Sequence, residues 1–185
     1  SSDVCSTDLG AEFWQFDTSA AISGTNPSMI KDIMSGSSGS WPGEFTAINS
    51  MIYFRAADAV NGSELWRFDP SAAISGTNPS MIKDIRPGVT DSLPRNFQVM
   101  GSTLYFYAND GTAGNELWKS DGTSTNTVMV KDIYPGISDG VLYFFPPIGS
   151  NLYFYAEDPT HGRELWRSDG ASAGTDRKST RLNSS

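Results

Sequence analysis

The chain has 185 residues, which suggests one domain or at most two small ones. It carries 21 acidic and 13 basic residues, a net charge of −8, whereas nucleic-acid binding needs a clustered basic surface. We therefore exclude a nucleic-acid partner and expect cations, sugars or other proteins. Aromatic residues make up 12% of the sequence, with 18 Gly and 10 Pro, which predicts an all-β fold rich in turns.

We expect no transmembrane segment, because the longest apolar run, residues 141–148, is interrupted by Pro146 and Pro147. No positively charged leader precedes an apolar segment, so any signal peptide is expected to be absent already. Cys5 is the single cysteine, which excludes an internal disulfide framework and a metal site built from several cysteines.

The motif Glu-Phe/Leu-Trp recurs along the chain. Its copies begin at Glu12, Glu64, Glu116 and Glu164, at steps of 52, 52 and 48 residues. Residues 19–33 are also identical to residues 71–85. Self-similarity at a period of this length predicts a repeat architecture in which each copy forms one structural unit.

Each repeat contains four runs that read as strands, separated by turns with Gly. In the third copy we expect the strands at 96–100, 103–108, 115–120 and 127–133. Leu104, Phe106 and Ala108 alternate with two tyrosines and should share one face of the sheet. Four antiparallel strands in about 40–50 residues are typical of a β-propeller blade.

The repeats predict how the chain is divided. Residues 1–7 form an N-terminal segment and residues 8–175 a β-propeller-like region. That region comprises a half blade (8–35), two blades (45–88 and 96–136) and an incomplete blade that lacks its last strand (143–175). Residues 176–185 are polar and out of pattern, so we interpret them as a non-native tail that can be removed without loss of the fold. About three and a quarter blades suggest a fragment of a larger propeller, since closed propellers usually have at least about four.

The repeated tryptophans, Trp14, Trp66, Trp118 and Trp166, are predicted to form the core between blades, because a lone blade cannot bury its faces. The alternative is that they form a platform on which sugars stack.

Basic residues follow the tryptophan or precede an aspartate at Lys31, Arg67, Lys83, Lys119, Lys131 and Arg167. For these we expect cross-strand pairing with aspartates, each exposed pair contributing at most about 1 kcal/mol.

The pattern Asp-x-x-x-Gly-x-Glu occurs three times between the second and third strands. The acidic residues are Asp58 and Glu64, Asp110 and Glu116, and Asp158 and Glu164. In one interpretation the Gly permits a positive φ and the Asp accepts backbone N–H groups in an Asx-type turn. In the other, each Asp and Glu supply oxygens to Ca²⁺, which takes about six to eight ligands. These six residues are the candidate metal ligands.

We predict no catalytic residue. Nucleophilic catalysis needs a base beside the nucleophile and a third group that orients the base. The one histidine, His161, lies in a turn where the other copies have Asn61 and Ala113. Apart from possible Ca²⁺, no cofactor is expected.

The segment Glu116–Thr123, Glu-Leu-Trp-Lys-Ser-Asp-Gly-Thr, resembles the bacterial ELWxxDGT repeat, which is also described as hyalin-like, and residues 164–170 are similar to it. The first two copies lack its Asp-Gly pair. The resemblance implies propeller-like architecture and export in large secreted or surface-attached proteins, and it implies no enzymatic activity.

Together these features predict a non-enzymatic, extracellular or cell-surface repeat module for binding, adhesion or structural assembly. The alternative is a carbohydrate-active propeller enzyme or a lectin that uses acidic and aromatic residues. We expect a protein or carbohydrate ligand. An open sheet edge also offers unpaired N–H and C=O groups for self-association.

Overall fold

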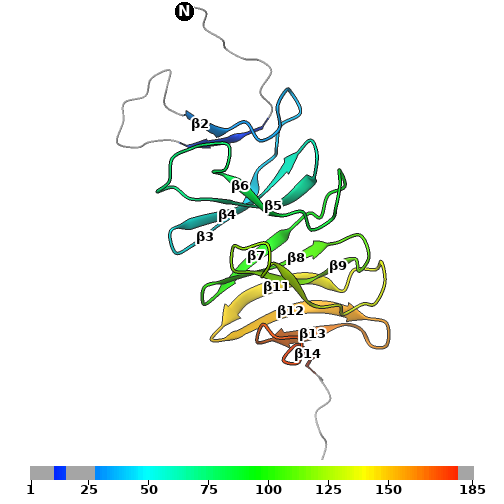
Figure 1. The fold of residues 1–185 in the computed structure, drawn as a ribbon. Helices are drawn as coiled ribbons and strands as arrows, with labels where there is room; N and C mark the ends of the chain where they lie inside the picture. The colour runs from blue at the N-terminus through cyan, green and yellow to red at the C-terminus, as the bar shows by residue number, and fades with distance from the viewer. Residues whose placement is uncertain (1–10, 16–27, 179–185) are drawn as a thin grey trace, which may run out of the picture. The chain divides into compact units, whose positions relative to one another are not determined.

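The computed structural model describes residues 11–15 and 28–178, and these residues form strands, turns and connections without a helix. The predicted all-β fold is confirmed (Figure 1). No helix that could cross a membrane occurs in this part of the chain. The strands are β1 (Phe13–Gln15), β2 (Ser28–Lys31), β3 (Gly43–Ile48), β4 (Met51–Asp58), β5 (Gly62–Phe68), β6 (Ser80–Lys83), β7 (Arg95–Met100), β8 (Thr103–Asn109), β9 (Asn115–Ser120), β10 (Val128–Lys131), β11 (Val141–Ile148), β12 (Asn151–Asp158), β13 (Gly162–Ser168) and β14 (Asp176–Arg177).

The strands form antiparallel sheets in which each strand pairs with the next one along the chain. We call the sheets β1–β2, β3–β6, β7–β10 and β11–β14 blades 1 to 4. Blade 1 has two strands and each of the others has four. This arrangement is the blade-like meander predicted from the repeat.

The chain forms two compact units that divide between Leu93 and Pro94. The first unit contains blades 1 and 2, and the second contains blades 3 and 4. In each unit the core lies between its two blades.

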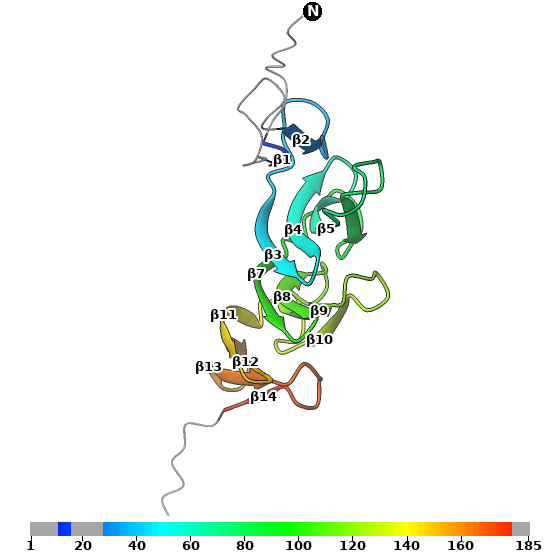
Figure 2. The same ribbon diagram turned by 90° about the vertical axis from the view of Figure 1, so that its left-hand side faces the viewer.

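In the second unit, blades 3 and 4 lie side by side in both views (Figures 1 and 2). The face of blade 3 that carries Tyr105 and Leu117 packs against the face of blade 4 that carries Phe154 and Trp166. Tyr107 stacks on Phe144 with ring centroids 6.2 Å apart. The buried residues of this core are Tyr105, Leu117, Val130 and Ile133 from blade 3, and Val141, Phe144, Leu152, Phe154, Ala156 and Trp166 from blade 4.

The first unit repeats this packing between blades 1 and 2. Phe13 and Ile30 of blade 1 pack against Phe54, Ala56 and Trp66 of blade 2. The predicted role of Trp66 and Trp166 as core between blades is therefore confirmed. Because the sugar-platform interpretation requires an exposed ring, it does not fit these two residues.

Trp14 does not follow the expectation. Its side chain is 45% exposed, whereas Trp66, Trp118 and Trp166 are 5%, 5% and 7% exposed. The equivalent tryptophans belong to complete blades, whereas Trp14 lies in a two-stranded sheet. The prediction that Trp14 is buried is wrong, because no described sheet covers the face on which it lies.

The end of blade 4 also differs from the prediction, which placed the last strand outside the chain. Asp176 and Arg177 form β14 and pair with Arg167 and Trp166 of β13. The Lys178 amide donates to the Leu165 carbonyl at 2.7 Å. Backbone hydrogen bonds do not depend on side-chain polarity, so a polar segment completes the sheet without the apolar pattern of the other copies. The predicted removable tail therefore begins too early, at residue 176.

This difference changes the expected effect of truncation. A chain that ends at Thr175 should lose the β13–β14 pairing, at a cost of roughly 1–3 kcal/mol for the few hydrogen bonds involved. Urea unfolding of this chain and of one that ends at Lys178 measures the difference. Equal midpoints would show that β14 contributes nothing to stability.

Lys31 and Lys131 connect neighbouring blades, and they do not form the pairs that we expected. Lys31 Nζ donates to Gly76 O at 2.9 Å and to Pro79 O at 3.0 Å, and it lies 5.6 Å from the Trp66 ring centre. Lys131 Nζ donates to Thr175 O at 2.8 Å. The expected pairing with an aspartate was therefore wrong for Lys31 and Lys131, because backbone carbonyls of the next blade lie closer.

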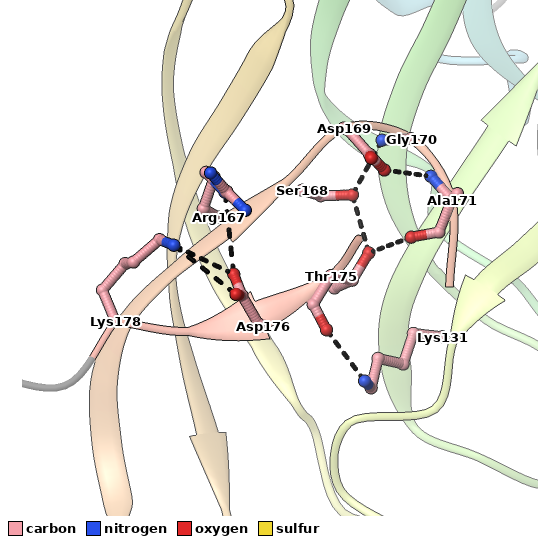
Figure 3. A network of polar contacts seen from close by, with 9 residues as sticks. All are labelled: Lys131, Arg167, Ser168, Asp169, Gly170, Ala171, Thr175, Asp176 and Lys178. Atoms are coloured by element: carbon pink, nitrogen blue, oxygen red, sulfur yellow. Dashed lines mark hydrogen bonds and ion pairs between the residues drawn. The ribbon is translucent and has the colours of Figure 1, made fainter. Parts of the chain in front are cut away.

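Figure 3 shows this contact in blade 4, together with the cross-strand pair that does form, Arg167 Nε and Asp176 Oδ1 at 3.6 Å. In the same network the hydroxyls of Ser168 and Thr175 lie 2.7 Å apart. They tie the end of β13 to the start of β14 and so fix the carbonyl that accepts from Lys131.

Candidate functional site

The candidate site is the acidic hairpin that recurs between the second and third strands of blades 2, 3 and 4. Its aspartate closes the turn. Asp110 Oδ1 accepts from the Thr112 amide at 2.8 Å and from the Ala113 amide at 2.9 Å. Asp58 and Asp158 bind the equivalent amides of their own turns, at 2.6–2.8 Å and 2.8 Å. The predicted Asx-type turn is confirmed in all three hairpins.

The glycine of the hairpin has the positive φ that we predicted: +69° at Gly62, +65° at Gly114 and +69° at Gly162. It also lies against another part of the chain. A Cβ at Gly62 would come within 2.9 Å of the Val89 carbonyl, and one at Gly114 would collide with the Ser138 carbonyl. In blades 2 and 3 the glycine therefore lets the hairpin dock against the connection that follows the last strand of its blade.

The glutamate of the hairpin fixes this connection. Glu64 is fully buried, and its carboxylate accepts from the Ile85 amide at 2.9 Å, the Ser92 amide at 3.2 Å and the Ser92 hydroxyl at 2.6 Å. Glu12 binds Ile33 and Ser40 in the same way, at 2.7–3.0 Å. The repeated glutamate thus links the third strand of a blade to the chain that leaves its fourth strand.

Blade 3 contains a variant of this link. Glu116 accepts from the Ile133 amide at 2.9 Å and the Tyr134 amide at 3.0 Å. At the position of Ser92 stands Gly140, and a Cβ there would collide with the Glu116 carboxylate. Loss of the serine hydroxyl is thus matched by a closer approach of the carboxylate to the backbone.

Sequence analysis missed two further contacts of the docked hairpin. Asp91 Oδ1 accepts from the Ser63 amide, and Asp139 Oδ1 accepts from the Asn115 amide, both at 2.8 Å. A constant spacing could have revealed where the connection meets the hairpin. The positions that lie against the glutamates, Ser40, Ser92 and Gly140, each follow the isoleucine of Lys-Asp-Ile by seven residues.

The two kinds of carboxylate differ in their electrostatics. Burial raises the pKa of Asp110, but amide and hydroxyl donors of the turn outweigh it and hold that pKa below its usual value. For Glu64 burial dominates over the hydrogen bonds and raises the pKa to about 7. Burial likewise raises the pKa of Glu116, which lacks the serine hydroxyl, to about 8.

These raised values predict a pH dependence of stability. In the unfolded chain Glu116 has a pKa near 4.5, so between this value and about 8 the native state binds more protons than the unfolded state. The stability gained from the protonated carboxyl is complete below the unfolded pKa and is lost as the pH rises through the native one. We expect the free energy of unfolding to fall across this range and Glu116→Gln to reduce the slope. Urea unfolding at a series of pH values tests this, and an unchanged slope in the variant would contradict it.

The structure does not give the Asp and Glu of a hairpin a common partner. Asp58 binds its own turn, whereas Glu64 binds the connection 85–92. Glu164 is half-buried in blade 4. In the described residues no group of three or more His, Cys, Asp or Glu side chains could hold a metal ion. Five of the six predicted ligands therefore make structural contacts, namely Asp58, Glu64, Asp110, Glu116 and Asp158, and calcium binding stays a prediction.

His161 is part of the third hairpin. Its Nδ1 lies 2.9 Å from Asp158 Oδ1, and its amide also donates to that atom. In blade 2 the Asn61 side chain donates to Asp58 Oδ2 at 2.8 Å from the equivalent position. The histidine thus makes a turn contact that an amide side chain makes in blade 2.

A polar hollow recurs at the other end of blades 2 and 3. It has a volume of about 430 Å³ in blade 2 and about 250 Å³ in blade 3. A basic residue, an aspartate and an asparagine occupy equivalent positions in both linings: Arg67, Asp69 and Asn78 in blade 2, and Lys119, Asp121 and Asn126 in blade 3. Tyr105 adds an aromatic ring to the second hollow. The aspartates of both hollows close turns, since Asp69 accepts from the Ser71 amide and Asp121 accepts from the Thr123 amide.

No family model matches the chain, and a comparison with curated proteins finds no match. Function is therefore inferred from the geometry and the repeats of the chain itself.

Proposed function

We propose that this chain is a non-enzymatic repeat module of a secreted or cell-surface protein, with a role in binding, adhesion or assembly. The observation that carries the proposal is recurrence. An active site is a unique place, whereas the reactive side chains of this chain make the same contacts in successive blades. Glu12 and Glu64 each bind an isoleucine amide and a serine, and Asp58 and Asp110 each close a turn.

The proposal is also supported by the hydrogen bonds that the Glu64 carboxylate oxygens already accept from the chain itself. A general acid or base must have an atom free to meet a substrate. The Glu64 carboxylate accepts three hydrogen bonds from its own chain and has no exposed surface. The resemblance to the ELWxxDGT repeat points in the same direction, toward export and away from catalysis.

Two measurements on the purified chain test this function. Sedimentation velocity over a range of protein concentrations detects self-association, and a panel of chromogenic glycosides detects hydrolysis. We expect association or ligand binding without turnover. Hydrolysis that is lost on replacing one carboxylate, for example in Glu164→Gln, would favour the enzyme and overturn the proposal.

The recurrent polar hollow favours a second candidate function, that of a lectin. A carboxylate, an amide and a cation that line one hollow can donate to and accept from neighbouring sugar hydroxyls. A glycan array identifies any ligand, and Lys119→Ala should then weaken binding because Lys119 lines the hollow. Unchanged binding would exclude this hollow as the sugar site. Lys119 Nζ also donates to Gly170 O at 3.0 Å, so unfolding of the variant must be measured in parallel.

Calcium binding by the acidic hairpins remains part of the proposal. At tenfold excess of calcium over Kd, a site bound only in the native state adds roughly 1.4 kcal/mol. We expect the thermal midpoint to rise in millimolar calcium and Glu116→Gln to reduce the rise, with Asp110→Asn as the second variant. A midpoint that does not change between chelator and calcium would leave both residues with their hydrogen-bonding roles alone.

A further inference from the structure

A row of three side chains runs across the second, third and fourth strands of each complete blade. The basic residue that follows the repeated tryptophan pairs with a tyrosine on one side and with a variable residue on the other. Directly paired residues of antiparallel strands have their side chains on one face of the sheet, with Cβ atoms about 4.5–5.5 Å apart. The rows are Tyr53, Arg67 and Ser80 in blade 2, Tyr105, Lys119 and Val128 in blade 3, and Tyr153, Arg167 and Asp176 in blade 4.

In blade 4 the variable residue is an aspartate, and its carboxylate binds the basic residue. Asp176 Oδ1 lies 3.6 Å from Arg167 Nε and 3.3 Å from Lys178 Nζ (Figure 3). A second aspartate, Asp169, follows Arg167 by two residues and accepts instead from the Ala171 amide at 2.9 Å. A carboxylate therefore fits beside the basic residue of this row although another acidic residue is close in sequence.

Blades 2 and 3 carry no charge at the variable position. Ser80 and Val128 stand there, and each lines the polar hollow of its blade together with the basic residue, Arg67 or Lys119. Lys119 Nζ donates to Gly170 O at 3.0 Å, and an ammonium group has three donors. The hollow of blade 3 thus places a cation with further donor capacity opposite an aliphatic side chain.

The aspartate of the blade 3 hollow accepts hydrogen bonds from its own turn. Asp121 Oδ1 accepts from the Thr123 hydroxyl at 2.7 Å, and Oδ2 accepts from Asn126 Nδ2 at 2.6 Å. These two hydrogen bonds hold the pKa of Asp121 below its usual value. Because both of its oxygens have partners in the turn, Lys119 is the charged group of this hollow that can attract an anion.

The charge of the chain limits the kind of anion. One basic residue lines each hollow, and the chain has a net charge of −8. The chain as a whole would repel a ligand with many closely spaced anionic groups, whereas a single carboxylate needs only one cation. Hydroxyl and amide side chains, which can pair with sugar hydroxyls, complete the linings: Thr103 and Asn126 in blade 3, and Thr77 and Asn78 in blade 2.

We propose that the polar hollows of blades 2 and 3 bind a sugar that carries a single carboxylate, as a hexuronic acid does. The carboxylate lies beside the basic residue, in the place that Asp176 takes beside Arg167 in blade 4, and the ring hydroxyls face the hydroxyl and amide side chains. This inference names the ligand class of the second candidate function, the lectin, and rests on it.

A titration of the full, ¹⁵N-labelled chain with the methyl glycoside of glucuronic acid tests the ligand class by NMR. The matched control is the methyl ester of the same sugar, which keeps the ring hydroxyls and loses the charge. A blocked glutamate residue supplies the carboxylate without the sugar. We expect saturable shifts of the Lys119 and Val128 amides with the uronate, and at least tenfold weaker binding of both controls.

Either control can overturn the proposal. Equal binding of the methyl ester would show that the hollow does not recognise the carboxylate. Equal binding of the blocked glutamate would show that the sugar ring contributes nothing and that an acidic peptide is the ligand.

Variants at the variable position locate the site. Val128→Asp gives blade 3 the carboxylate that blade 4 has at Asp176, and Val128 is 36% exposed, so the side chain can reach solvent. The new carboxylate should pair with Lys119 and weaken uronate binding in blade 3 at least tenfold. Val128→Asn is the matched control of equal size without charge, and Ser80→Asp and Ser80→Asn repeat the comparison in blade 2.

Two results with these variants would contradict the inference. Parental binding in Val128→Asp and Ser80→Asp would show that the ligand does not lie beside the basic residue. Equal losses in the aspartate and asparagine variants would show that the shape of the hollow matters and its charge does not. The amide spectrum of each variant shows directly that the chain is folded.

Failure of the inference differs from failure of the proposed function. If neutral sugars bind the hollows as well as the uronate does, the lectin function stands and the acidic ligand class is wrong. If the chain self-associates and binds no sugar, the lectin and this inference both fail, whereas the module function stands. Glycoside hydrolysis would overturn the module function itself.

Discussion

Replacing Trp66 by alanine is expected to lower the free energy of unfolding by about 3–5 kcal/mol, as truncation of a large core side chain does. Trp66 is 5% exposed and packs with Phe13, Ile30 and Phe54 between blades 1 and 2. Lys31 also lies over its ring. Removing the indole thus leaves a cavity in the contact that holds two sheets together.

The matched control is Trp14→Ala, the same repeat position in a residue that is 45% exposed. Because truncation at Trp14 opens no closed cavity, it should cost less than about 1 kcal/mol. Urea unfolding, with midpoint and slope compared for both variants, measures the difference. A parental midpoint for Trp66→Ala would show that the contact between blades 1 and 2 does not limit stability.

Glu64→Ala is expected to cost about 2–4 kcal/mol. It leaves the Ile85 amide and the amide and hydroxyl of Ser92 without their acceptor in a buried place, where each unpaired donor costs about 1–3 kcal/mol. Burial of the carboxylate itself is unfavourable, as its raised pKa of about 7 indicates, so its removal offsets part of this loss. Glu64→Gln keeps one acceptor oxygen and should cost less than Glu64→Ala.

Glu164→Ala provides the control within the same motif. Glu164 is half-buried, and no described residue donates a hydrogen bond to it. Its replacement should change the unfolding free energy by at most about 0.5–1 kcal/mol. Equal costs at the two positions would contradict the assignment of Glu64 as the residue that fixes the connection. Hydrogen exchange at the Ile85 and Ser92 amides gives a local measure, and both should exchange faster in Glu64→Ala.

The hairpin illustrates which part of the candidate site was open to prediction. Asp110 binds amides two and three residues ahead, and the φ of Gly114 depends on its own lack of a Cβ. Such contacts are encoded within a few neighbouring residues. The partners of Glu64 lie 21 and 28 residues away, and no local pattern specifies a partner at that distance. The sequence motif thus predicted the turn and missed the link.

The lysines illustrate the same limit. The sequence led us to expect an aspartate partner for Lys31 and did not identify its acceptors. The acceptors are carbonyls of residues 76 and 79, in the next blade. Every residue has a carbonyl, so composition and spacing do not distinguish one that accepts a side-chain hydrogen bond. Only the packing of one blade on the next decides it.

The sequence by itself determined that this protein is an all-β repeat chain with four strands in each complete copy, because periodicity of two and turn chemistry are local properties of the backbone. Tertiary structure alone decided that β14 completes blade 4, that the repeated glutamates fix the connections, and that Trp14 is exposed whereas Trp66 is buried. Identical motif positions differ in burial because burial depends on the sheet that lies against them. Trp66 packs against blade 1, whereas no described sheet lies against the face of blade 1 that carries Trp14.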